Sequence, residues 1–188
     1  MTRRARFNFC ALRVLFCATL LAPAGGYSGE PDVWDMLGPE RIGAGFDDVA
    51  QRIALHCGAE AARRVCTVSS PTAIVFADVT VVRIEAVFGD SRLEQVRVTL
   101  GIKQYANLFR VLTARYGEGD DRSFNAIAGM GGDFAAGVHV WRVAAVSLVL
   151  EQYAGKIDRS ALTYGSASSM ADLVRKANSY ARGARRDL

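Results

Sequence analysis

The chain has few of the residues on which catalysis and metal binding usually depend. It contains two histidines and four cysteines in 188 residues. The C-x-x-C pair of redox dithiols and the G-x-S-x-G elbow of serine hydrolases are both missing. So are the phosphate-binding G-x-x-x-x-G-K-[ST], the dinucleotide-binding G-x-G-x-x-G and the EF-hand spacing. We therefore expect no enzyme activity, no cofactor and no metal.

The N-terminal segment has the three parts of a secretory signal peptide. Its first nine residues hold three arginines and no acid, the apolar run Cys10–Leu21 follows, and an A-x-A site ends at Ala24. We predict that residues 1–24 are a signal peptide cleaved after Ala24 and that residues 25–188 form one periplasmic or secreted domain. The apolar run is too short for a transmembrane helix, so we expect no stable membrane insertion after cleavage. An uncleaved anchor and a buried N-terminal helix are the alternatives.

Removal of that segment also removes the excess of positive charge. Four of the 23 basic residues and none of the 19 acidic ones lie in residues 1–24, which leaves 19 of each sign. Nucleic-acid binding needs a strongly basic face. We therefore expect no nucleic-acid partner.

Cys57 and Cys66 are the only cysteines beyond the predicted signal peptide. In an oxidising compartment such a pair is usually a disulfide, and we predict one here. Free thiols are one alternative. A zinc site with His56 is the other, but His56 and Cys57 would point about 100° apart on a helix, which makes joint ligation awkward.

Hydrophobic periodicity predicts an α+β fold. Helices are expected over residues 47–56, 103–116 and 169–182. Strands are expected over 73–77, 80–88, 93–100, 138–143, 146–152 and 160–164. Because most strands are joined as hairpins, we predict an antiparallel sheet with amphipathic helices packed on one face. Residues 43–100 and 101–165 are each led by a helix between glycines, which suggests two related halves.

The long connection over residues 118–137 is rich in glycine. Within it we identify a candidate interaction loop made of Gly129, Gly131, Gly132, Asp133 and Phe134. Asp120, Asp121 and Asp133 could supply oxygen ligands to calcium, but they do not have the EF-hand spacing.

Among the remaining residues, His139 is the one candidate for catalysis. It lies in the predicted strand 138–143, and we interpret it as a satisfied or exposed strand residue. A pocket that holds it together with an acid and a hydroxyl would instead favour an enzyme with a dispersed site. Trp34, Trp141 and Tyr164 are expected to be core or edge residues, not a ligand platform.

The segment around the first predicted helix resembles a known family. The residues that carry this resemblance are Gly43, Gly45, Phe46, Asp47, Asp48, Val49 and Gly58. The pattern is similar to the SmpA/OmlA (BamE-like) envelope proteins and to the fold of the β-lactamase inhibitor protein. The resemblance implies a non-enzymatic module whose sheet contacts another protein. The chain departs from the lipidated members because it has no lipobox cysteine.

These observations favour a bacterial envelope protein that acts as a non-catalytic protein-interaction module. The expected contact surface is an open sheet face or the connection over residues 118–137. An inhibitor or ligand-binding accessory protein is the alternative, followed by an enzyme with a dispersed site. Neither the partner nor the oligomeric state follows from the sequence.

Overall fold

The computed structural model describes residues 32–59, 63–69, 74–127, 133–180 and 186–187. The predicted signal peptide and Gly129, Gly131 and Gly132 lie outside these residues. In the part of the chain that is described, no helix is long and apolar enough to cross a membrane.

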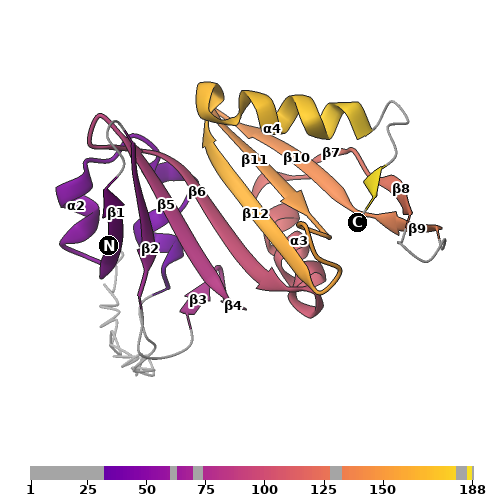
Figure 1. The fold of residues 1–188 in the computed structure, drawn as a ribbon, viewed down its shortest axis with the longest axis horizontal. Coiled ribbons are helices and arrows are strands. Elements are labelled where there is room, and N and C mark those ends of the chain that lie inside the picture. The colour runs from indigo at the N-terminus through magenta and orange to yellow at the C-terminus, as the bar shows by residue number, and fades with distance from the viewer. Residues whose placement is uncertain (1–31, 60–62, 70–73, 128–132, 181–185, 188) are drawn as a thin grey trace, which may run out of the picture.

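An antiparallel sheet of eight strands forms the centre of the fold (Figure 1). In spatial order its strands are β1 (Leu55–Ala59), β2 (Arg63–Val68), β5 (Arg83–Gly89), β6 (Arg92–Gly101), β12 (Arg159–Ser166), β11 (Val146–Glu151), β10 (Val138–Val143) and β7 (Asp120–Asp121). The α+β class and the antiparallel sheet are confirmed. The sheet consists of two four-stranded runs that meet where β6 pairs with β12. This order is compatible with two related halves, which stay a prediction.

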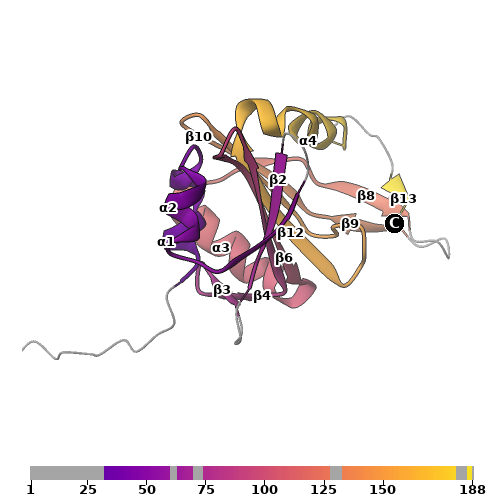
Figure 2. The same cartoon turned by 60° about the vertical axis from the view of Figure 1, so that its left-hand side comes forward.

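Helices lie on both faces of the sheet, so the predicted one-sided packing is not confirmed. The helices are α1 (Trp34–Leu37), α2 (Phe46–Ala50), α3 (Tyr105–Tyr116) and α4 (Ala167–Tyr180), with short 3-10 turns at Pro39–Arg41 and Ile102–Gln104. Figure 2 shows α1, α2 and α3 gathered on one side of the sheet. Two separate apolar clusters account for this arrangement, because α1 and α3 contribute to one and α4 to the other.

The alternation of side chains along the strands explains why helices pack on both faces of the sheet. Along β10, Val138 and Val140 join the cluster under α4, whereas Trp141 joins the cluster under α3. The buried residues of α4 are Met170, Ala177 and Tyr180. Because successive side chains of a strand point to opposite faces, an apolar strand in the middle of the sheet can support a helix on each side.

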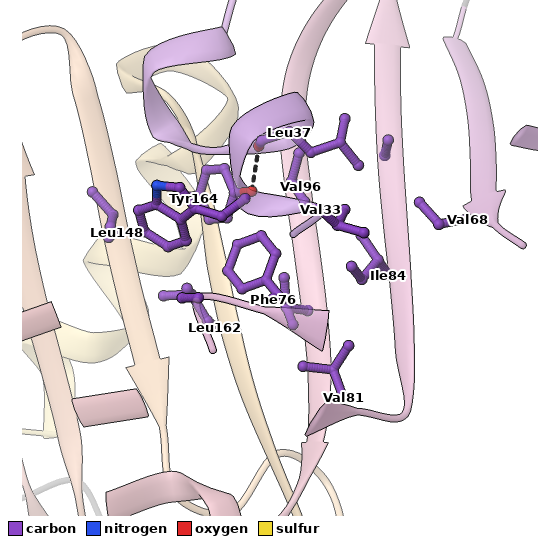
Figure 3. Close-up of a cluster of buried hydrophobic side chains, with 14 of the residues drawn as sticks. Val33, Leu37, Val68, Phe76, Val81, Ile84, Val96, Leu148, Leu162 and Tyr164 are labelled. Atoms are coloured by element: carbon purple, nitrogen blue, oxygen red, sulfur yellow. Dashed lines mark hydrogen bonds between the residues drawn. The ribbon is translucent and has the colours of Figure 1, made fainter. Parts of the chain in front are cut away.

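The larger cluster is built around Tyr164 (Figure 3). Its side chain is fully buried, and its hydroxyl donates a hydrogen bond to the carbonyl oxygen of Leu37 at the end of α1. The rings of Tyr164 and Phe76 are stacked with centroids 6.2 Å apart. Trp34 and Trp141 are also buried, as expected. A residue late in the chain thus holds the first helix against the sheet.

The predicted helix over residues 47–56 is wrong in its second half. The helix ends at Ala50, and His56 and Cys57 lie in strand β1. Val49 and Ile53 are buried as a helical pattern requires. From Leu55 onward the chain instead pairs with β2, and this long-range pairing overrides the local pattern. Gly58 is therefore also a strand residue and does not end a helix.

Two small sheets were not fully predicted. The expected strand over residues 80–88 divides at Val82 into β4 (Val79–Val81), which pairs with β3 (Ile74–Phe76), and β5. Alternation along a continuous strand over 80–88 would place Val82 on the same side as the buried Ile84, but Val82 is 52% exposed because the strand is interrupted there. The connection over residues 118–137 contains β7, β8 (Phe124–Ile127) and β9 (Asp133–Ala136), with β13 (Arg186–Asp187) beside β8.

Candidate interaction surface

The cysteine pair forms a disulfide between adjacent strands. Cys57 in β1 lies directly opposite Cys66 in β2, with an S–S distance of 2.07 Å and a Cα–Cα distance of 3.9 Å. Cys66 is fully buried, whereas Cys57 is exposed. The predicted disulfide is therefore confirmed, but it joins two strands and not a helix end to a strand. It fixes the outermost strand to the sheet.

One face of the first four strands meets a helix only at β6, where the start of α4 contacts Glu94 and Gln95 through Ser169 and Met170. The rest of this face has no helix packed on it among the described residues. We define the open face by the outward side chains of these strands, which are His56, Arg63, Val65, Thr67, Arg83, Glu85, Val87, Glu94, Gln95, Arg97 and Thr99. All of these residues are exposed or half-buried. On the opposite face of the same strands, Cys66, Ile84 and Val98 are fully buried. Only half of this side of the sheet is covered, because α4 packs mainly on β11 and β12.

Two of the arginines on the open face form ion pairs, whereas Arg97 has no carboxylate partner among the described contacts. Arg63 lies 3.0 Å from Glu94, and Arg83 lies 2.9 Å from Glu85. Arg97 donates a long hydrogen bond of 3.5 Å to the hydroxyl of Thr163. Exposed ion pairs of this kind contribute at most about 1 kcal/mol each to stability. Their side chains can therefore exchange partners at low cost.

The open face also carries a row of small and apolar residues. Strand register places Gly58, Val65 and Val87 in this row across β1, β2 and β5, and the polar Gln95 of β6 ends the row. Val65 and Val87 are both half-buried. The neighbouring line is polar and consists of His56, Thr67, Glu85 and Arg97. A shallow apolar line beside a polar one offers both contact area and directional contacts to a second protein.

The predicted interaction loop is only partly described. Phe134 lies in β9, where its half-buried ring meets Tyr153 edge to face at a centroid distance of 5.0 Å. Asp133 begins the same strand. This part of the glycine-rich connection is therefore β structure and not an open loop.

Two of the three aspartates considered for calcium, Asp120 and Asp121, are engaged with other groups. Asp120 pairs with Arg122 at 3.3 Å and with Arg142 at 2.9 Å. Asp121 accepts the backbone N–H of Ser123 at 2.8 Å, and hydrogen bonds from Ser123 hold the pKa of Asp121 below its usual value. No group of three or more potential metal ligands occurs among the described residues.

His139 lies in an aromatic cluster at the far edge of the sheet. Its ring centroid is 4.3 Å from that of Phe109 and 5.9 Å from that of Trp141. Asp121 is its cross-strand neighbour on β7. The nearby hydroxyl of Ser123 accepts the backbone N–H of Val138. An acid and a hydroxyl do lie near His139, but both bind backbone groups, so their main role here is to hold the edge of the sheet.

The position of His139 predicts a pH-dependent loss of stability. Burial lowers the pKa of His139 below its ordinary value of 6.5, and Asp121 opposes this only in part. The unfolded chain therefore takes up a proton at a higher pH than the folded chain. The free energy of unfolding should fall as the pH drops through 6.5 toward the folded pKa. Urea titrations at pH 7 and pH 5 should show a smaller fall for His139→Gln. Since His56 is present in both proteins, equal falls would contradict this assignment.

A groove of about 590 Å³ on the helical side was not anticipated from the sequence. It is lined by Asp32, Trp34, Asp35, Ala77, Asp78, Val111, Ala114 and Arg115. The Asp32 carboxylate accepts N–H groups of Trp34, Ala77 and Asp78. The Arg115 guanidinium lies 4.5 Å from the centre of the Trp34 ring. These contacts mainly tie α1 to the β3–β4 turn and to α3.

Comparison with known proteins identifies no relative. The chain matches no protein-family model, no curated protein and no solved structure.

Proposed function

We propose that this protein is an exported, non-catalytic module of a bacterial envelope that binds another protein through its open face. The observation that supports this most is the uncovered half of the sheet, where Val65 and Val87 stay half-exposed beside arginines. Arginine is enriched at protein interfaces, and partly exposed apolar residues gain from being covered. The N-terminal sequence pattern supports export, and the disulfide agrees with an oxidising compartment.

An inhibitor or accessory protein would use the same surface. The row from Gly58 to Val87 could receive a segment of a target enzyme that lies across the strands. What separates the two functions is the nature of the partner, because an inhibitor lowers the activity of an enzyme and an assembly factor does not.

The proposal is tested by photocrosslinking in the envelope. A photoreactive residue at Thr67 should give a discrete crosslinked product, and one at Asn107 on the exposed side of α3 should not. Val87→Glu should weaken that crosslink at least tenfold, since it puts a charge into the apolar row, and tenfold corresponds to about 1.4 kcal/mol. Val82→Glu is the matched control, because Val82 is 52% exposed and lies between β4 and β5, outside the strands that form the open face. Equal crosslink yields from Thr67 and Asn107 would refute the proposal, as would an equal loss of the crosslink in Val87→Glu and Val82→Glu.

A further inference from the structure

Strand β1 presents an open edge that differs from the other edge of the sheet. Within the described part of the chain, β1 pairs with β2 on one side and with no strand on the other. The opposite edge strand, β7, has two residues, both aspartates. Short length and charge are the usual means by which edge strands avoid pairing with other chains. Strand β1 is longer, with five residues, and contains no aspartate, glutamate, lysine or arginine.

Two observations determine which backbone groups of β1 point outward. The N–H of Ser69 donates to the carbonyl oxygen of Ala54 at 3.0 Å, so this pair is hydrogen-bonded. Hydrogen-bonded and non-hydrogen-bonded pairs alternate along antiparallel strands. Cys57 and Cys66 are then a non-hydrogen-bonded pair, which agrees with their short Cα–Cα distance of 3.9 Å. The N–H and C=O groups of Leu55, Cys57 and Ala59 therefore point away from β2.

The edge is also held in a shape suited to pairing. The register of β1 with β2 runs without a bulge from Leu55 to Ala59. The disulfide at Cys57 fixes the middle of the strand to its neighbour. An edge that is already ordered loses little conformational entropy when another strand is added. The exposure of Cys57 means that no described element covers this position.

The sequence of β1 is complementary to itself in the antiparallel direction. With a two-fold axis beside Cys57, Leu55 lies opposite Ala59 of the second copy, and His56 lies opposite Gly58 of the second copy. Each larger residue thus faces a small one, which avoids a steric clash across the new pair. Every outward backbone group of Leu55, Cys57 and Ala59 finds a partner in this register.

We propose that two copies of this protein pair antiparallel through β1 and form a two-fold dimer. The contact is isologous, so it closes at two subunits and does not propagate into a fibre. It joins the two eight-stranded sheets into one continuous sheet and places the two open faces side by side. This inference stands independently of the proposed envelope partner, since it rests on the edge and not on the face.

The first test is sedimentation velocity of the disulfide-intact protein from about 1 to 200 µM, the range expected for a small contact. The wild type should shift from monomer to dimer with concentration. Gly58→Lys should weaken dimerisation at least tenfold, because its side chain fills the space opposite His56 of the second copy. A Cβ at Gly58 meets nothing within 4 Å, and its φ is not positive, so the monomer tolerates the change. Gly101→Lys is the matched control, since Gly101 is equally unhindered and lies away from β1.

The second test uses amide hydrogen exchange, read residue by residue at low and high concentration. In the dimer the amides of Leu55, Cys57 and Ala59 should gain protection, whereas those of His56 and Gly58 are protected at both concentrations. A wild type that stays monomeric, a Gly58→Lys variant that dimerises like Gly101→Lys, or protection that appears elsewhere would overturn the proposal. Protection of this edge only when another protein is added would likewise overturn it in favour of strand addition by that protein.

Discussion

Replacement of Tyr164 by alanine is expected to lower the free energy of unfolding by about 3–5 kcal/mol. The side chain is fully buried in the larger cluster, and its ring stacks on Phe76 and lies near Leu37 (Figure 3). Its removal leaves a cavity between α1 and the sheet that the surrounding backbone cannot close. Urea unfolding followed by circular dichroism measures the loss.

The phenylalanine variant separates the ring from the hydroxyl. Tyr164→Phe keeps the packing but leaves the buried carbonyl oxygen of Leu37 without its donor, which costs about 1–3 kcal/mol. Val82→Ala, at an exposed position, should change stability by no more than about 0.5 kcal/mol. If Tyr164→Phe were as stable as the wild type, the hydrogen bond would not be what holds α1 in place.

This contact matters because it closes the fold over a long stretch of chain. Tyr164 and Leu37 are 127 residues apart in sequence. The hydroxyl reaches the end of α1, and α1 in turn carries Trp34 against Phe76 at a centroid distance of 4.9 Å. One buried side chain of β12 therefore links the N-terminal elements to the middle of the sheet.

The parts of the fold that were predicted correctly depend on local patterns. The alternation of apolar and polar residues in β5 and β6 identified the hairpin, and the opposite faces of Ile84 and Glu85 followed from it. The helix α3 was recognised from its apolar stripe, and Gly117 ends it with a φ of 79°, where glycine is favoured. Periodicity over a few residues is enough for such elements.

The errors arise where distant segments decide the structure. The local pattern around Leu55 is ambiguous, and only pairing with β2 makes it a strand. The helix expected over residues 169–182 begins earlier, at Ala167, and the N–H of Ser169 donates to the Ser166 hydroxyl. The strands within residues 118–137 are short and lack runs of β-branched residues. Pairing with other strands makes them strands, and their own sequence does not predict it.

The open face was predictable in its residues but not in its exposure. Alternation along the predicted strands 80–88 and 93–100 places Arg83, Glu85 and Arg97 on the polar side of the hairpin. Whether a helix covers that side depends on α4, which follows β12 and packs mainly over β11 and β12. No local pattern states which strands a later helix will cover. The polar face of α4 would be compatible with packing over β11 and β12 or over the first four strands.

The disulfide should contribute roughly 2–3 kcal/mol to stability. It closes a loop between residues nine positions apart, and such a crosslink acts mainly by restricting the unfolded chain. For a domain of this size the loss on reduction corresponds to roughly 5–10 °C in Tm. Calorimetry of the protein with and without reductant measures this. The double variant Cys57→Ala/Cys66→Ala should unfold at a similarly reduced Tm, and reductant should change it no further.

The same cysteines also test export, because a disulfide of this kind forms where the compartment is oxidising. Protein recovered from the periplasm should have an intact mass that begins at Gly25, and its two thiols should react with iodoacetamide only after reduction. A full-length mass together with free thiols would contradict both export to the envelope and the covalent link between β1 and β2. In that state the outer strand would be held by backbone pairing alone. The unreduced and reduced proteins should then show equal Tm values, in contrast to the loss of roughly 5–10 °C expected here.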